Sequence, residues 1–239
     1  PVGIMLTAAS HLQCESATIT QKLQQEKLGV KQLSAYLQTT LESSDLICNC
    51  CNRAAELIQS FKQVAVDQAG AVRRQFDMAS YLNEVVQSLK PSFKNRPVSI
   101  SINCPEGITL DSYPGTVAQI LTNLVLNSLR HAFSEDETGS IGITVSQLEQ
   151  PANWLEWVYE DNGAGIPYEY HSKVFEPFFT TNRQQGGSGL GLHIVYSCVT
   201  QVLQGSIVMS STPDQGTCFI IRMPLTVQND ASAQQTELD

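Results

Sequence analysis

The sequence predicts an α+β protein in which a helical hairpin precedes an α/β sandwich domain. Residues 1–66 carry apolar residues at helical spacing and few helix breakers, since Gly29 is the only glycine between Gly3 and Gly70. After about residue 70, short β-type runs alternate with helical segments. We therefore predict a hairpin at residues 1–68, a domain at residues 69–225 and a disordered tail at residues 226–239.

The hairpin is predicted as two long amphipathic helices. The first is expected at about residues 2–27 and the second at residues 33–66, with a break near residues 28–32. Apolar residues on the second helix recur in steps of three and four, as at Leu33, Leu37 and Leu41, and form one stripe. Nothing obvious in the chain covers this stripe. We therefore predict a homodimer in which two hairpins form a four-helix bundle.

The domain is predicted as a largely antiparallel sheet with helices on one face. Strands are expected at residues 74–77, 98–103, 141–148, 155–160, 206–210 and 218–223. Helices are expected at residues 78–89, 114–133 and 189–203, and Pro114 stands where a first helical turn tolerates proline. The final residues, 226–239, are polar and are expected to be disordered.

The composition of the chain indicates which partners it can bind and in which compartment it is expected. The net charge of −9, from 14 Lys and Arg against 23 Asp and Glu, argues against a general nucleic-acid-binding surface. The sequence shows no signal peptide and no apolar run of about 18 residues, so we expect a cytoplasmic chain without membrane contact. The seven cysteines are expected to be reduced. Cys48, Cys50 and Cys51 could form a metal site, but no histidine lies near them, which favours small buried hydrophobes.

Polar residues recur on the helix predicted at residues 114–133. Asn123 and Asn127 are four residues apart and share one face, and Arg130 and His131 follow one turn later. An amide oxygen can coordinate Mg²⁺, and a guanidinium can bind phosphate oxygens. Two asparagines on a helix are also common as solvated surface residues, so this segment alone does not establish a site.

Two glycine-rich segments follow along the chain. After the strand at residues 155–160, Asp161 leads into a loop whose Gly163 and Gly165 permit positive φ and close approach to a ligand. An ordinary Asn-Gly turn is the alternative. Residues 186–191 lead into an apolar helix whose free N–H groups can bind an anion, although a flexible connection has the same composition. A dinucleotide-binding motif is disfavoured because polar residues, rather than a strand, precede this run.

In their order and spacing, these segments together resemble the histidine kinases of the superfamily that also holds gyrase, Hsp90 and MutL. Residues 119–131 resemble the family's N box, 161–165 its G1 box, 174–179 its F box and 186–192 its G2 box. The resemblance covers residues 74–224 and implies a Bergerat-type fold that binds ATP and Mg²⁺. It implies an ATP-dependent protein histidine kinase, the kinase core of a bacterial two-component sensor.

The resemblance implies a role for each matching position. Asn127 would hold Mg²⁺, with Asn123 beside the phosphates. Arg130 would contact a phosphate, and His131 would lie near the sugar or base. Asp161 would accept a hydrogen bond from the adenine amino group.

Further positions would surround the same nucleotide. Gly163 and Gly165 would pack close to it, and Thr217 would act at the adenine through water. Backbone amides of the second glycine-rich run would cradle the phosphates, at Gly187, Gly189, Leu190 and Gly191. Residues 168–188 would form an ATP lid, from which Arg183 is a candidate to reach the γ-phosphate. The lid would be anchored by Phe175, Phe178 and Phe179.

The hairpin resembles the family's dimerisation and phosphotransfer domain, with a gap. The residues that follow Pro1 read like the end of the acceptor box, so the acceptor histidine is expected shortly before Pro1. His11 lacks the acidic neighbour and the proline of that box, and the role is not given to it. The resemblance implies a response-regulator aspartate as the next acceptor of the phosphoryl group.

Two other functions stay open at this point. Water-using ATPases of the same superfamily normally place a glutamate four residues before the metal-binding asparagine. That position here is Asn123, which cannot act as a general base. The other alternative is a non-catalytic dimer scaffold that binds nucleotide. Asn127, Asp161 and the glycines argue against it, whereas the missing acceptor leaves it open.

Overall fold

The computed structural model describes residues 2–25, 27–70, 72–94, 96–134, 136–181 and 188–228, and the side chains of these residues other than 52, 53 and 55–70. The chain divides into two compact units, one of Pro1–Gln63 with Thr180–Ser188 and one of Val64–Phe179 with Gly189–Asp239, so that the first boundary lies between Gln63 and Val64. This boundary lies within a continuous helix, a few residues before the predicted one at residue 68. Each unit is described by itself.

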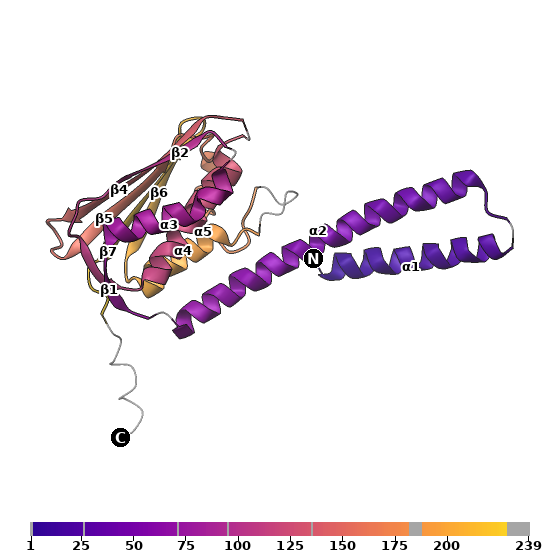
Figure 1. Cartoon of the computed structure of the whole chain (residues 1–239), viewed down its shortest axis with the longest axis horizontal. Helices are drawn as coiled ribbons and strands as arrows, with labels where there is room; N and C mark the ends of the chain where they lie inside the picture. The colour runs from indigo at the N-terminus through magenta and orange to yellow at the C-terminus, as the bar shows by residue number, and fades with distance from the viewer. Residues whose placement is uncertain are drawn as a thin grey trace, which may run out of the picture. The chain divides into compact units, whose positions relative to one another are not determined.

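The first unit is an antiparallel hairpin of α1 (Val2–Gln24) and α2 (Val30–Gly70) (Figure 1). The Ser16 and Tyr36 hydroxyls are 2.7 Å apart, and Cys51 Sγ donates to Met5 Sδ at 3.2 Å, so the two helices run in opposite directions. The predicted hairpin is confirmed. Its second helix is longer at both ends than the apolar stripe indicated.

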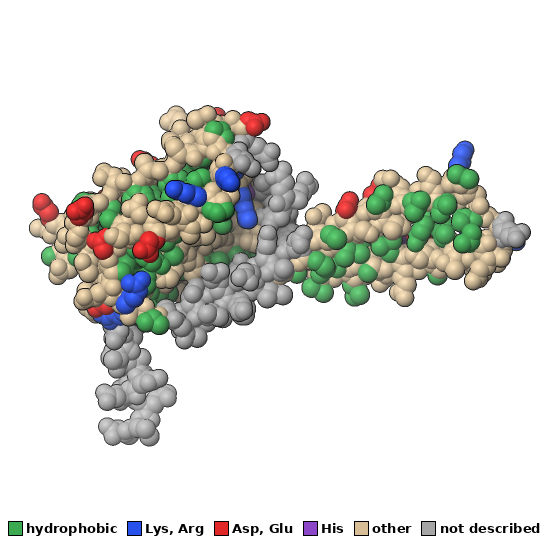
Figure 2. All heavy atoms as spheres, in the orientation of Figure 1, with side chains coloured by type: hydrophobic (Ala, Val, Ile, Leu, Met, Phe, Trp, Pro, Cys, Tyr) green, Lys and Arg blue, Asp and Glu red, His purple; other side chains and the backbone are tan. Residues whose placement is uncertain are grey.

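Apolar side chains of this hairpin remain exposed in a single chain (Figure 2). Leu33, Leu37 and Leu41 are 41%, 53% and 63% exposed. Of the clustered cysteines, Cys50 is buried as expected, whereas Cys48 and Cys51 are exposed. Within the described ranges, no three His, Cys, Asp or Glu side chains are grouped to hold a metal ion.

The second unit contains a five-stranded sheet in the order β2-β4-β5-β7-β6, and helices α3, α4 and α5 cover one of its faces (Figure 1). The strands are β2 (Val98–Asn103), β4 (Gly139–Leu148), β5 (Trp154–Asp161), β6 (Ser206–Thr212) and β7 (Gly216–Pro224). The pair β2–β4 is parallel and the other three pairs are antiparallel. A separate antiparallel ribbon joins β1 (Arg74–Asp77) to β3 (Thr109–Ser112).

The core lies between the sheet and the helices α3 (Met78–Phe93), α4 (Pro114–Asn127) and α5 (Gly191–Ser197). In β5 the alternation of side chains sends Leu155, Trp157 and Tyr159 into this core, where all three are fully buried. Leu121 and Leu124 of α4 lie in the same core. The predicted α+β sandwich is therefore confirmed, with Asp161 at the last position of a buried strand.

Several elements differ from the predicted ones. Helix α3 continues through Pro91 to Phe93 instead of ending at residue 89. Pro91 has no N–H to donate to the carbonyl four residues earlier, so the last turn has one hydrogen bond fewer than the rest of the helix. Strand β3 was not predicted. Helix α4 ends at Asn127, and residues Ser128–Ala132 continue as a π-helical turn. A second π-helical turn, Cys198–Val202, follows α5.

The C-terminal boundary also requires a correction. Thr226 forms a β-bridge with Asp111, and Val227 is 2% exposed. Gln228 exchanges two hydrogen bonds of 2.9 Å with the Gln204 side chain. Residues 226–228 therefore belong to the domain rather than to a tail, because one buried apolar residue fixes them. Residues 229–239 of the predicted tail lie outside the described residues.

No helix among the described residues is both long and apolar enough to cross a bilayer.

Candidate functional site

The two asparagines of α4 face the first residue of α5. A Cβ added to Gly191 would lie 3.2 Å from Asn127 Oδ1 and 3.4 Å from Asn123 Oδ1, so a larger residue would press on both amides. Asn123 Nδ2 donates to the Gln119 carbonyl at 2.9 Å. The Asn127 side chain has no hydrogen-bond partner among the described residues, so its amide oxygen is available to an added ligand.

Beyond Asn127, the π-helical turn presents Arg130 and His131 at the surface. The pKa of His131 is lowered, first by the desolvation that accompanies partial burial and then by the neighbouring Arg130 charge. Arg96, which precedes β2, donates from its guanidinium to the carbonyls of Leu129, Phe133 and Ser134. This contact satisfies carbonyls that the end of the helix leaves without N–H partners. Sequence reasoning missed Arg96 because nothing in its local pattern points to a helix end more than thirty residues away.

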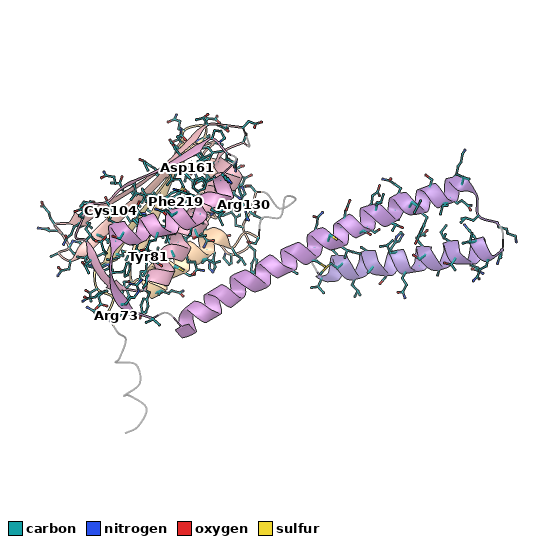
Figure 3. All side chains as sticks on the ribbon, viewed as in Figure 1. Arg73, Tyr81, Cys104, Arg130, Asp161 and Phe219 are labelled. Atoms are coloured by element: carbon teal, nitrogen blue, oxygen red, sulfur yellow. The ribbon has the colours of Figure 1, made fainter. Side chains whose placement is uncertain are left out.

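Asp161 is 9% exposed as a residue, and its carboxylate accepts hydrogen bonds from three separate segments. Oδ2 accepts from Ser128 Oγ at 2.7 Å, and Oδ1 accepts from the N–H groups of Gly163 and Thr217 at 3.1 and 3.3 Å. Burial raises the pKa of Asp161, and these donors act in the opposite direction. Figure 3 labels Asp161 and Arg130, both away from Arg73 at the start of the domain.

The glycines after Asp161 are explained by close backbone packing. A Cβ on Gly163 would overlap Ala132, whose carbonyl accepts from the Ala164 N–H at 2.9 Å. Gly165 has φ +68°, and a Cβ there would overlap the Thr212 carbonyl. The loop therefore lies tightly against both the π-helical turn and the β6–β7 hairpin. These glycines were predicted to let a ligand approach closely. The structure shows that they are also required for the close approach of other backbone segments.

Thr217 lies beside Asp161, because the two residues are paired in the β5–β7 register. Its Oγ1 is 3.0 Å from Ser211 Oγ, which donates to the Gly216 carbonyl and accepts from the Ile166 N–H, both at 2.8 Å. Sequence reasoning did not single out Ser211. No signal in the sequence distinguishes it from the neighbouring serines of β6.

The segment before the second glycine-rich run packs only in part. Phe175 contacts the rings of Tyr196 and Phe219, and its carbonyl lies 3.0 Å from His193 Nδ1, so it anchors the segment as predicted. The Phe179 ring meets that of Tyr170. Phe178, however, is 59% exposed and is not part of the core.

The second glycine-rich run is described only from residue 188 onward. Gly189 has φ +69°, and a Cβ there would lie 2.7 Å from the Phe178 and Phe179 carbonyl oxygens. Leu190 packs partly against the core, and α5 begins at Gly191. Arg183 and Gly187 lie outside the described residues.

The structure thus brings the predicted residues into two neighbouring groups. One contains the amides of Asn123 and Asn127 beside Gly191. The other contains Asp161 with Thr217. They are joined through the peptide bond between Asn127 and Ser128, since Ser128 donates to Asp161. The Asp161 group offers a buried hydrogen-bond acceptor, and the asparagine group offers an amide oxygen. This pair suits a ligand with an amino group at one end and a cation at the other.

Comparison with known proteins agrees with this arrangement. Residues 113–227 match the family model described as histidine kinase-, DNA gyrase B-, and HSP90-like ATPase. The chain is 33% identical over 154 residues to the sensor protein TorS of Escherichia coli, which covers 64% of this chain and 16% of that protein. It is 30% identical over 152 residues to the alginate biosynthesis sensor protein KinB of Pseudomonas aeruginosa, covering 62% of this chain and 24% of that protein.

Among solved structures, the catalytic domain of the histidine kinase ThkA superposes with a TM-score of 0.56 and 26% identity. The match covers 65% of this chain and 97% of that domain. The chain spans less than a quarter of the length of the two sensor proteins, with 16% and 24% covered. The likeness therefore concerns the domain that carries the two groups of residues.

Proposed function

Because residues 113–227 belong to the histidine kinase-, DNA gyrase B-, and HSP90-like ATPase family, and the domain is a catalytic domain of the sensor histidine kinase type, we propose that this chain is the kinase core of a sensor. It binds Mg-ATP and transfers the γ-phosphoryl group to a histidine on a dimerising helix. A response-regulator aspartate then receives the phosphoryl group. The dimer forms through the hairpin, in the cytoplasm.

The proposal depends most on Asp161, which presents a buried and anchored acceptor. Three donors from the π-helical turn, the following loop and β7 hold the carboxylate in one orientation. A carboxylate has about four lone-pair positions, so three bonds leave capacity for one more donor. The amino group at adenine N6 is such a donor. The Thr217 nitrogen lies 3.3 Å from Asp161 Oδ1, and this residue contacts the same end of the base through water.

Asn127 suits the phosphate end of the nucleotide. Its amide oxygen is a hard ligand without a protein partner among the described residues, and Mg²⁺ prefers one or two protein oxygens together with phosphate oxygens. Arg130 at the surface of the π-helical turn, and Arg183 from the lid, supply positive charge to the phosphates. The amides of Gly187, Gly189, Leu190 and Gly191, with Asn123 beside them, complete this end.

The chemistry needs position and charge more than covalent participation. Bound Mg²⁺ supplies neutralisation of the phosphate charge. The neutral imidazole nitrogen of the acceptor histidine attacks the γ-phosphorus as the bond to the bridging oxygen breaks, and ADP leaves. The ring releases its proton to solvent and carries a phosphoramidate. His131, near the sugar or base, is not that acceptor in this proposal.

The ATPase alternative is disfavoured by Asn123. Its Nδ2 already donates to the Gln119 carbonyl, and an amide cannot take a proton from water at neutral pH.

A phosphate-labelling experiment distinguishes the kinase from the ATPase. We would incubate the protein, extended upstream of Pro1 through the expected acceptor, with Mg²⁺ and γ-labelled ATP, and test the chemical stability of any label. Acid-labile, alkali-stable label on the protein supports the kinase.

Matched variants connect this result to the site. Asn127→Asp and Asp161→Asn should each remove the label. Glu156→Gln alters a carboxylate of the same strand that pairs with Arg222 on the outer face, and should retain it. Release of free phosphate without protein label would instead support the ATPase. Nucleotide binding with neither product would leave a scaffold, and the kinase proposal would then be wrong.

A further inference from the structure

A chain of buried hydroxyl groups leads from the interior of the sheet to Asp161. The Tyr159 hydroxyl donates to Ser128 Oγ at 2.9 Å, and Ser128 Oγ donates to Asp161 Oδ2 at 2.7 Å. Tyr159 is fully buried and Ser128 is 4% exposed, so water does not replace either bond. An ionised carboxylate can only accept, and therefore both hydroxyl groups must point toward Asp161.

We propose that Ser128 and Tyr159 are positioning residues that keep the Asp161 carboxylate ionised and oriented as an acceptor for the amino group of the nucleotide base. The inference rests on the proposed nucleotide-binding function. Neither hydroxyl touches the nucleotide, since each acts through the next group in the chain.

The need for these donors follows from the burial of Asp161. Burial favours the protonated form, whose added proton would turn one acceptor oxygen into a donor. Ser128 opposes this as the side-chain donor, and the amides of Gly163 and Thr217 oppose it from the backbone. Deletion of one donor should therefore shift Asp161 toward protonation.

No cation among the described residues compensates the charge of Asp161. The groups that face it are Ser128 from the π-helical turn, Tyr159 from β5, the Gly163 amide and the Thr217 amide from β7. Of these, Tyr159 is the titratable one. Its pKa is raised well above the usual range, first by burial, so its hydroxyl remains a neutral donor. The hydroxyl groups of Ser128 and Tyr159 are therefore the part of the carboxylate's surroundings that side-chain substitution can remove.

The same chain links the two ends of the site. Ser128 directly follows Asn127, so the residue that fixes Asp161 is covalently attached to the residue proposed to hold Mg²⁺. Tyr159 stands two positions before Asp161 on β5, and its hydroxyl reaches across to the π-helical turn. A change in the turn would thus alter the acceptor for the base as well as the metal ligand.

The test compares pH profiles of ADP affinity, measured by calorimetry from about pH 8 down to about pH 4, the ordinary pKa of an aspartate carboxyl group, above which the raised pKa of Asp161 lies. Affinity of the unaltered chain should decline as the pH falls and Asp161 takes up a proton. Ser128→Ala should move the midpoint of this decline to higher pH, because a donor that lowers the pKa is lost. A shift of one unit corresponds to roughly tenfold weaker binding below both midpoints.

Two further variants separate positioning from a general effect of mutation. Tyr159→Phe should shift the midpoint in the same direction but by less. Ser112→Ala removes a fully buried serine hydroxyl with no hydrogen-bond partner in the described part of the chain, and should leave the midpoint unchanged. The phosphates of ADP titrate identically in every case, so they cancel in the comparison.

A double variant tests the order of the chain. Ser128→Ala leaves the Tyr159 hydroxyl buried without its acceptor, so adding Tyr159→Phe should raise the melting temperature relative to Ser128→Ala alone. The midpoint of the double variant should equal that of Ser128→Ala. If Ser128→Ala does not fold, Tyr159→Phe alone decides, and an unchanged midpoint overturns the proposal.

The outcomes distinguish this inference from the function on which it rests. Failure of the unaltered chain to bind ADP would contradict the proposed function. Normal ADP binding with the same midpoint in folded Ser128→Ala would leave that function intact and overturn the positioning role.

Discussion

The two units of this chain bury their apolar residues to very different extents. Leu37 and Leu41 of the hairpin are 53% and 63% exposed in a single chain, whereas Leu155 and Trp157 of β5 are fully buried. Burial of apolar surface is the main favourable contribution to folding. The domain therefore has the means to fold by itself, while the hairpin leaves much of its apolar stripe for another surface to cover.

The polar side chains differ in the same way. In the hairpin, Thr18 and Thr20 donate to the carbonyls four residues before them, so these bonds remain within one helix. In the domain, Ser128 and Thr217 converge on Asp161 from positions far apart in the sequence. The candidate ligand site of the domain thus depends on polar groups that tertiary structure brings together. The exposed apolar surface of the hairpin depends only on the amphipathic pattern of its helices.

The largest expected effect is on the buried acceptor. Asp161→Asn preserves the shape but offers the base an amide that can donate, so nucleotide affinity should fall by about 100-fold or more. Calorimetric titration with ADP measures this.

The same variant also tests stability. The pKa of Asp161 is raised in the folded state, so the folded protein gains stability as the pH falls through that pKa. Above that pKa the ionised, buried carboxylate destabilises the fold. The variant should therefore melt no lower than the unaltered chain at neutral pH. A much lower melting temperature would mean that Asp161 serves the fold.

The next effect separates the two units. Leu37→Asp places a charge in the exposed stripe of α2 and should weaken the predicted homodimer by about 10- to 100-fold, measured by analytical ultracentrifugation. ADP affinity should not change, because the domain forms its core without the hairpin. Gln32→Glu adds a charge at an exposed position of the same helix and should leave the dimer intact. A monomeric unaltered chain would refute the predicted bundle.

A smaller effect concerns backbone packing. Gly163→Ala would force a methyl group into Ala132 and should lower the free energy of unfolding by about 2–3 kcal/mol. Gly29→Ala, at the residue just before α2, adds a Cβ that meets nothing within 4 Å, and should change stability by less than about 0.5 kcal/mol. Denaturant unfolding compares the two. Equal costs would show that the site loop is not tightly packed.

Sequence periodicity was sufficient for most of the elements. The ranges 74–77 and 98–103 coincide with β1 and β2, because alternation and helical spacing are local signals. The turn Ser128–Ala132 was not foreseen, since a wider helical turn lacks a sequence pattern of its own. Thr226 and Val227 read as tail because a single buried apolar residue gives no period.

The site shows the same limit. Asn123, Asn127 and Asp161 were recognisable because chemistry and spacing mark them along the sequence. Ser128 and Tyr159 were not singled out, although they lie one and two positions from predicted residues. Their hydroxyl groups form the hydrogen-bonded chain to Asp161 only when β5 packs beneath the π-helical turn. Buried polar partners of this kind depend on tertiary contacts that no local pattern encodes.

The smallest expected effect tests whether the domain's helices rely on local signals more than the hairpin does. Asp77 caps α3, since its Oδ1 accepts from the Ser80 N–H at 2.8 Å. Asp77→Ala should lower the free energy of unfolding by about 1 kcal/mol, measured by denaturant unfolding at neutral pH. The Ser80 hydrogen bond lowers the pKa of Asp77, so the cap contributes fully above the unfolded pKa and is lost as the pH falls through the folded pKa. The difference in unfolding free energy between Asp77→Ala and the unaltered chain should therefore shrink below about pH 4. Asp77→Asn retains an acceptor without the titration and should cost less at neutral pH. A difference that persisted unchanged in acid would show that Asp77 stabilises α3 by packing instead of by its charge.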